Sequence, residues 1–193
     1  MREAAKESKR EKIMEAAIQV FSKKGYHQTR MEEIAVAAGI GKGTIYEYFD
    51  SKLQLVQHIM ETSLLMYYEA MGDEERSRLS FEDRIRIMIM GHFRFCQQNK
   101  ALTRILFWDT EIIDEELKDW SYQIRREKEE KMRSIVEEAM QKGEIRQADP
   151  YLVTQIFLGV MGSMLVPVIL EDQEFDVAQV AQEITDLLMY GLK

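Results

Sequence analysis

Apolar side chains recur at helical spacing along almost the whole chain, and this repeat restricts the fold more than any other feature. Residues three, four or seven positions apart share one face of an α-helix, because 3.6 residues make a turn. The first such face consists of Ile13, Ala16, Ala17, Val20 and Phe21. Only two prolines, Pro150 and Pro167, interrupt the 193 residues. No segment alternates apolar and polar residues as a half-buried strand does, and we therefore predict an all-α protein.

Three short helices are predicted at the start of the chain. The first, roughly residues 9–24, ends at Gly25, a residue that readily adopts the left-handed conformation of a helix stop. Thr29 and Glu32 have the spacing of a capping box that would open the second helix. A glycine-containing turn separates this helix from a third, which starts near Gly41. Two short helices joined in this way are typical of a helix-turn-helix, whose last helix enters the major groove of DNA.

The segment from Met31 to Lys52 carries a specific resemblance. It reads MEEIAVAAGIGKGTIYEYFDSK and resembles the head of TetR-family repressors, with agreement over about residues 10–55. The family often has Ser, Thr or Asn at the position of Gly41, and glycine is a slightly weaker N-cap. The resemblance implies a helix-turn-helix domain over residues 1–52, double-stranded operator DNA as partner, and a C-terminal helical bundle over residues 53–193 that binds a ligand and dimerises.

A group of polar and small residues in the head is predicted to contact DNA. The start of the second helix offers free backbone N–H groups to a phosphate, and the first residues of the third helix reach base edges. Tyrosine hydroxyls and lysines contact the sugar–phosphate backbone. The predicted DNA-binding residues are Thr29, Arg30, Lys42, Gly43, Thr44, Tyr46, Tyr48 and Lys52. The alternatives are core packing for the tyrosines and an ordinary solvated charge for the lysines.

The segment from Asp149 to about Leu170 is predicted to be a helix that is apolar nearly all round. Asp149 would cap it, with Pro150 at the first helical position. A helix of this kind is buried on more than one side, and the simplest cover for its outer face is a second copy of the chain. The predicted dimer interface comprises Leu152, Ile156, Val160, Val180, Ile184, Leu187 and Leu188. The alternative is a central helix of a monomer.

Large apolar residues of the C-terminal part are predicted to line a ligand cavity. Thirteen methionines suit it to flexible apolar guests, and two arginines would meet an anionic head group. The predicted ligand-binding residues are Met88, Phe93, Arg94, Arg104, Phe107, Trp108, Trp120, Phe157, Met161 and Met164. The alternative is ordinary core. The stretch from Leu170 to Asp176, after a helix with Gly159 and Gly162, resembles the acyl-CoA-responsive fatty-acid-degradation repressors, which implies acyl-CoA as the effector.

No arrangement of residues suggests catalysis or metal binding. Cys96 is the only cysteine and lies at an apolar helical position, where a thiol is usually inert. His27, His58 and His92 lack the spacing of metal ligands. We therefore predict no enzyme activity, no metal and no cofactor.

Charge and composition predict a cytoplasmic DNA-binding protein. The net charge is −8, yet residues 1–52 contain ten Lys or Arg and eight Asp or Glu, so a mildly basic head joins an acidic body. The N-terminus lacks the apolar core of a signal peptide. The longest apolar stretch, Ile156 to Leu170, is short for a bilayer and contains Pro167, and we expect no membrane partner.

These features together predict a homodimeric repressor that binds a palindromic operator and is released by a small apolar or acyl-type effector. One alternative is a DNA-binding regulator or activator without a small-molecule ligand, which a body without an enclosed cavity would favour. Another is a ligand-binding or enzymatic helical bundle that merely carries a helix-turn-helix, which failure to bind any DNA would favour.

Overall fold

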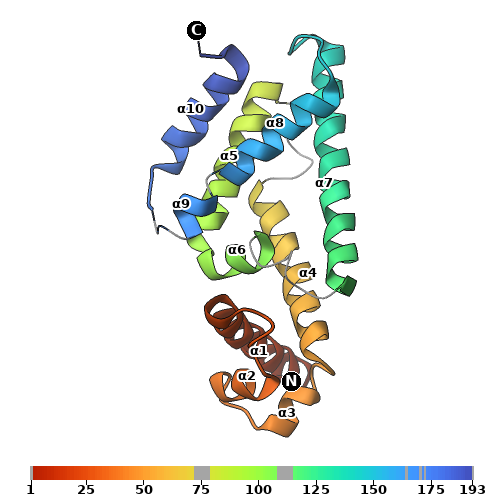
Figure 1. Ribbon diagram of the computed structural model, residues 1–193, viewed down its shortest axis with the longest axis vertical. Helices are drawn as coiled ribbons and strands as arrows, with labels where there is room; N and C mark the ends of the chain where they lie inside the picture. Colours follow the sequence, from red (N-terminus) through yellow and green to blue (C-terminus); the bar gives the residue numbers. More distant parts are fainter. Residues whose placement is uncertain are drawn as a thin grey trace. The chain divides into compact units, whose positions relative to one another are not determined.

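The computed structural model describes residues 2–71, 79–107, 115–163, 165–169, 171 and 173–192. Within these ranges every regular element is a helix, in agreement with the predicted all-α class (Figure 1). The helices are α1 (Arg2–Lys24), α2 (Met31–Ala37), α3 (Lys42–Tyr46), α4 (Lys52–Met71), α5 (Phe81–Gln98), α6 (Lys100–Phe107), α7 (Glu115–Lys142), α8 (Pro150–Ser163), α9 (Leu165–Ile169) and α10 (Val177–Tyr190).

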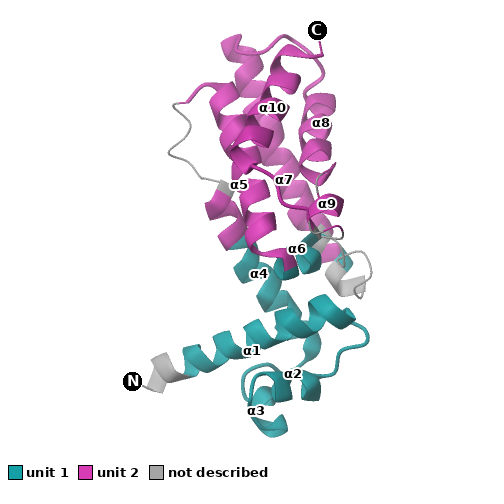
Figure 2. Cartoon of the chain, turned by 90° about the vertical axis from the view of Figure 1, so that its left-hand side faces the viewer, with its two compact units in different colours: residues 1–65, 101–118 teal, residues 66–100, 119–193 magenta. Residues whose placement is uncertain are grey.

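The chain folds into two compact units (Figure 2). Unit 1 contains Met1–Leu65 and Ala101–Lys118, and unit 2 contains Met66–Lys100 and Asp119–Lys193. Helix α4 therefore begins in unit 1 and ends in unit 2. The functional boundary at residue 52 stays a prediction, because compactness and function need not divide a chain at the same place.

The first three helices pack together in unit 1, where α2 contacts both α1 and α3. Their apolar faces meet in a core of fully buried side chains, namely Ile13, Ala17, Phe21, Ile34, Ile45 and Phe49. Gly25 follows α1 with φ 76°, so the predicted stop at this residue is confirmed, and Gly39 in the turn after α2 has a similar φ of 67°. This core holds α3 in place, although a helix of five residues would not be stable alone.

The predicted capping box of Thr29 and Glu32 is wrong by one residue. The N-cap of α2 is Arg30, whose backbone N–H donates to Oε2 of Glu33 at 3.0 Å. Thr29 is buried, and its hydroxyl donates to the carbonyl of Gly25 at 2.8 Å. Thr29 therefore closes the α1–α2 connection, because an inward hydroxyl bonds to the backbone that lies nearest.

Unit 2 is built around α5, which packs against α8, α9 and α10. The shared core comprises Phe81, Ile85, Ile89, Phe93, Met132, Val136, Ala139, Met140, Phe157 and Ala181. The predicted cap at Asp149 is confirmed, and Ser80 and Asp176 cap α5 and α10 in a similar way. Ser80 Oγ accepts from the N–H of Asp83, Asp149 Oδ1 accepts from Tyr151, and Asp176 Oδ1 accepts from Ala178 and Gln179.

The helix predicted after Asp149 is described as α8 and α9, on the two sides of Met164, which lies outside the described residues. Among the described residues one stretch, Pro150–Val168, is long and apolar enough to cross a bilayer by length and composition alone, with a mean hydropathy of 1.7. Only 18% of that window is buried inside the protein. A helix whose apolar face packs against another protein has the same length and composition. The exposed apolar surface of this stretch therefore needs an explanation.

Candidate functional site

Helix α3 presents its first turn to solvent. Ile45 is fully buried and anchors the helix, whereas Lys42, Gly43 and Tyr46 are exposed. A Cβ atom added at Gly43 would meet nothing within 4 Å. Gly43 is therefore not needed for packing inside the protein, and the space in front of its backbone is available to another molecule.

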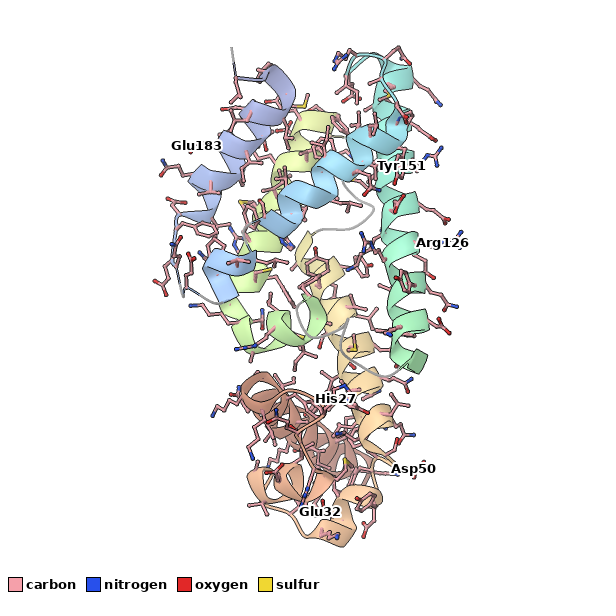
Figure 3. The ribbon with its side chains drawn as sticks, viewed as in Figure 1. His27, Glu32, Asp50, Arg126, Tyr151 and Glu183 are labelled. Atoms are coloured by element: carbon pink, nitrogen blue, oxygen red, sulfur yellow. The ribbon has the colours of Figure 1, made fainter. Side chains whose placement is uncertain are left out.

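An ion pair connects α2 with the start of α3. Lys42 Nζ lies 2.7 Å from Oε1 of Glu32, and both side chains are exposed. The hydrogen bond between them raises the pKa of Lys42 and lowers the pKa of Glu32. Glu32 stands on α2 in unit 1 (Figure 3). The outward cation at this surface is consequently balanced by a carboxylate.

Lys52 is engaged inside unit 1. Its ammonium group donates to the carbonyl of Tyr26 at 2.6 Å and to the carbonyl of Thr29 at 2.9 Å, and Nζ lies 4.2 Å from the centre of the Tyr26 ring. Partial burial lowers the pKa of Lys52. Two of its three N–H donors are used in this way, so the residue fixes the start of α4 to the connection between α1 and α2.

The other predicted DNA-binding residues differ in exposure. Arg30 is exposed at the N-cap of α2, Thr44 and Tyr48 are half-buried, and Thr29 is buried. The structure thus brings Arg30, Lys42, Gly43 and Tyr46 to the surface of unit 1.

Unit 2 contains a small cavity of about 120 Å³. It is lined by Tyr67 and Tyr68 of α4, Ile85, Met88 and Ile89 of α5, Lys128, Lys131, Met132 and Ile135 of α7, and Phe157, Leu158 and Met161 of α8. Apolar side chains dominate the wall. An apolar cavity of about 150 Å³ admits a benzene-sized guest, so this space suits a short apolar group as it stands.

Two lysines interrupt the apolar lining. Lys128 Nζ lies 5.1 Å from the ring centre of Tyr67 and 5.7 Å from that of Tyr68, within the range of cation–π attraction. Burial lowers the pKa of Lys128 to about 8, so the ammonium form still prevails at neutral pH. Burial, with a smaller effect of Glu127, raises the pKa of Tyr68 to about 12 and keeps its hydroxyl protonated.

A buried hydrogen-bond chain runs beside the cavity. The carbonyl of Met161 can only accept, so Nε2 of His92 donates to it at 2.8 Å, and Nδ1 accepts from the Tyr67 hydroxyl at 2.8 Å. Burial lowers the pKa of His92 to about 4, and the ring is therefore neutral at physiological pH. This chain connects α4, α5 and the last turn of α8.

The predicted ligand-binding residues are only partly brought together. Met88, Phe157 and Met161 line the cavity. Phe93 is fully buried in the core, Arg94 is exposed on α5, and Trp120 is half-buried on α7. Arg104 and Phe107 belong to unit 1, while Trp108 and Met164 lie outside the described residues.

Sequence analysis missed the charged and aromatic part of the lining, namely Tyr67, Tyr68, Lys128 and Lys131. A signal for Lys128 was present. It lies four residues after Ile124 and four before Met132, on the stripe of α7 that should be apolar.

The predicted dimer residues fall into two groups. Leu152 and Ile156 on α8 and Leu187 on α10 are 58%, 56% and 50% exposed. Val180, Ile184 and Leu188 are half-buried and pack against the core of unit 2, and Val160 is half-buried. Leu152 and Ile156 lie one helical turn apart, and the exposed Gly159 extends their row.

Two sequence families match the chain. The family "Bacterial regulatory proteins, tetR family" matches residues 13–59. The family "Tetracyclin repressor-like, C-terminal domain" matches residues 78–166.

Similar proteins and structures extend over nearly the whole chain. The fatty acid metabolism regulator protein of Bacillus subtilis (strain 168) is 24% identical over 181 residues, which cover 93% of each chain. The crystal structure of FadR from Bacillus subtilis in complex with stearoyl-CoA has a TM-score of 0.80 at 24% identity, and covers 94% of this chain and 98% of the other. The crystal structure of AibR in complex with isovaleryl coenzyme A and operator DNA has a TM-score of 0.77 at 22% identity, with the same coverage.

Proposed function

Because the chain belongs to the tetR family of bacterial regulatory proteins, we propose that it is a homodimeric repressor that an acyl-type effector releases from its operator. The family makes the chain a DNA-binding transcription regulator and not an enzyme. The observation that carries the proposal is the exposed first turn of α3, with open space in front of Gly43. A helix-turn-helix reads base edges with this part of its last helix.

The DNA contacts that we propose follow from exposure. The backbone of Gly43 approaches the duplex closely, Lys42 and Thr44 flank it at the base edges, and Tyr46 reaches the phosphate backbone through its hydroxyl. Arg30 binds a phosphate at the start of α2, with support from Tyr48. Thr29 and Lys52 act by positioning, because their polar atoms already bond within unit 1.

The exposed apolar row on α8 supports a two-fold interface. Leu152, Ile156 and the neighbouring Gly159 form a surface that water solvates poorly, and Leu187 on α10 adds to it. A second copy offers a surface of identical chemistry. A two-fold dimer then recognises a palindrome whose half-sites are one turn or a multiple of one turn apart.

The effector proposal combines the cavity with the relatives. The solved FadR structure contains stearoyl-CoA and the AibR structure contains isovaleryl coenzyme A and operator DNA, and we propose that this chain binds an acyl-CoA through its cavity. A volume of about 120 Å³ is too small for a long acyl chain, so binding requires a widened cavity. A ligand that prefers the widened form shifts the population of the protein toward it, and release of DNA follows if that form binds the operator weakly.

Selection of DNA from a random library with the purified full chain tests the proposal. We expect enrichment of an inverted repeat, protection of both half-sites from nuclease, and recovery of free DNA when dodecanoyl-CoA is added. Selection without any preferred sequence would remove the DNA part of the proposal. If the protein binds a specific DNA sequence and no acyl-CoA of any length weakens that binding, a regulator without a ligand is favoured. The small size of the cavity makes this the main alternative.

A Glu32→Gln variant should bind DNA about three- to tenfold more tightly, for operator and unrelated duplex alike. In the wild type the Glu32 carboxylate lies 2.7 Å from the Lys42 ammonium group and neutralises it. Without this carboxylate Lys42 can bind a phosphate, and the slope of log affinity against log salt concentration becomes steeper by up to about one unit. Fluorescence anisotropy at several salt concentrations measures both. Glu15→Gln, on the exposed face of α1, serves as control. If Glu32→Gln weakens operator binding and Glu15→Gln does not, the Glu32 carboxylate instead contacts a base.

A further inference from the structure

A buried chain of two hydrogen bonds joins two of the helices that line the cavity in unit 2. The Tyr67 hydroxyl on α4 donates to Nδ1 of His92 on α5, and Nε2 of His92 donates to the carbonyl of Met161 on α8, both at 2.8 Å. Tyr67 and Met161 line the cavity, whereas His92 is not among the lining residues that the structure describes. His92 therefore lies behind the wall of the cavity and ties its α4 part to its α8 part.

This chain of bonds is enclosed by the protein. Tyr67 is 4% exposed and His92 is 2% exposed. The ring of Phe95 lies against Tyr67 and the ring of Phe93 against His92, each with its centre 5.3 Å away. In such surroundings a broken hydrogen bond is not readily replaced by one to water, so its loss is more costly than at the surface. Movement of α4 away from α8 therefore acts against these two bonds.

Packing alone does not account for His92. It shares the buried face of α5 with Ile85, Ile89 and Cys96, where a leucine or phenylalanine would avoid placing a polar ring in the core. Burial lowers the pKa of His92 to about 4, so the ring stays neutral and keeps one donor and one acceptor nitrogen. A connection between a hydroxyl donor on α4 and a carbonyl acceptor on α8 requires this pair of nitrogens.

We propose that His92 determines the size of the apolar group that the cavity admits, because it holds Tyr67 and Met161 together and so keeps the cavity small. A short apolar group binds with both bonds intact, whereas a longer chain binds only after one of them breaks. His92 is thus a positioning residue that acts through Tyr67 and Met161. The inference rests on the proposed effector function and names what resists the widening of the cavity that this function requires.

Binding of a short and a long acyl-CoA to the full chain without DNA tests this inference. Titration calorimetry compares butanoyl-CoA, whose acyl group has fewer heavy atoms than benzene, with dodecanoyl-CoA. The main variant is Tyr67→Phe, which removes the hydroxyl and keeps the ring. Tyr68→Phe is the matched control, because Tyr68 also lines the cavity on α4 and loses the same group without breaking the chain of bonds. His92→Phe removes both bonds, and thermal unfolding verifies that each variant folds.

We expect Tyr67→Phe to bind dodecanoyl-CoA about three- to tenfold more tightly than the wild type, since a buried hydrogen bond no longer has to break. Its affinity for butanoyl-CoA should stay at the wild-type value, so the ratio of the two affinities rises. Tyr68→Phe should leave this ratio unchanged, and His92→Phe should raise it at least as much as Tyr67→Phe. A substitution that merely loosened the core would change the affinity for both ligands by the same factor.

A ratio that Tyr67→Phe leaves unchanged, or that Tyr68→Phe raises equally, overturns the inference while the effector proposal stands. Failure of the wild type to bind any acyl-CoA overturns the inference and the effector proposal together. The selection of DNA from a random library is a separate measurement, so the DNA part of the proposed function does not depend on either outcome.

Discussion

A Gly43→Asp variant should keep its fold and lose operator affinity by about 100-fold or more. The new Cβ meets nothing within 4 Å, and an acidic residue in the first turn of α3 suits the helix dipole, so the protein itself tolerates the change. At the DNA surface the carboxylate would occupy the space of a base edge and face phosphates. Like charges brought together at an interface cost several kcal/mol, and each 1.4 kcal/mol is a factor of ten in affinity.

Anisotropy titration with the selected operator measures the loss, and circular dichroism with thermal unfolding measures the fold. Gln19→Asp is the control, because it adds the same charge at an exposed position of α1 in the same unit. Wild-type affinity in Gly43→Asp would mean that α3 does not face the duplex through its first turn, and the proposed contacts of Lys42 and Thr44 would fall with it.

An Ile156→Glu variant should be monomeric at micromolar concentration and bind the operator at least about 100-fold more weakly. Ile156 is 56% exposed in the middle of the apolar row on α8. In a two-fold interface the substitution places two carboxylates in an apolar contact, and burial of an unpaired charge is strongly unfavourable. In the proposed dimer each protomer binds one half-site, so loss of the dimer would also remove the gain from simultaneous binding.

Sedimentation velocity over a concentration series measures the oligomeric state of this variant. Tyr122→Glu is the matched control, since Tyr122 is 63% exposed on α7 and its replacement also exchanges a large side chain for a carboxylate. A dimeric Ile156→Glu protein would exclude the α8 row as the interface. A dimer lost in both variants would instead point to a wider disturbance of unit 2.

Local signals in the sequence predicted several helix ends, because the residues that end a helix act through the nearest backbone groups. Gly25 ends α1 and Asp149 caps α8 as expected. Thr29 shows the limit of this reasoning. Its spacing to Glu32 fits a capping box, but its hydroxyl turns inward to Gly25, and that choice depends on how α1 and α2 pack.

The cavity in unit 2 was harder to predict than the surface of α3. A helix-turn-helix has a fixed spacing, so Lys42, Gly43 and Tyr46 could be placed at the surface from the sequence alone. The cavity is formed by four helices far apart in the chain, and their relative rotation decides which side chains face it. Arg94 was expected at the ligand and is exposed on α5, whereas Lys128, which the periodicity of α7 made conspicuous, lines the cavity.

The ion pair between Lys42 and Glu32 has a consequence for DNA binding at high salt. If Lys42 leaves Glu32 to reach a phosphate, the freed carboxylate attracts a cation, so fewer counterions are released in total and the affinity for any duplex falls less steeply as the salt concentration rises. Such a regulator gains little affinity from non-specific electrostatic binding to DNA. It should therefore stay bound to its operator at salt concentrations at which more strongly cationic proteins dissociate.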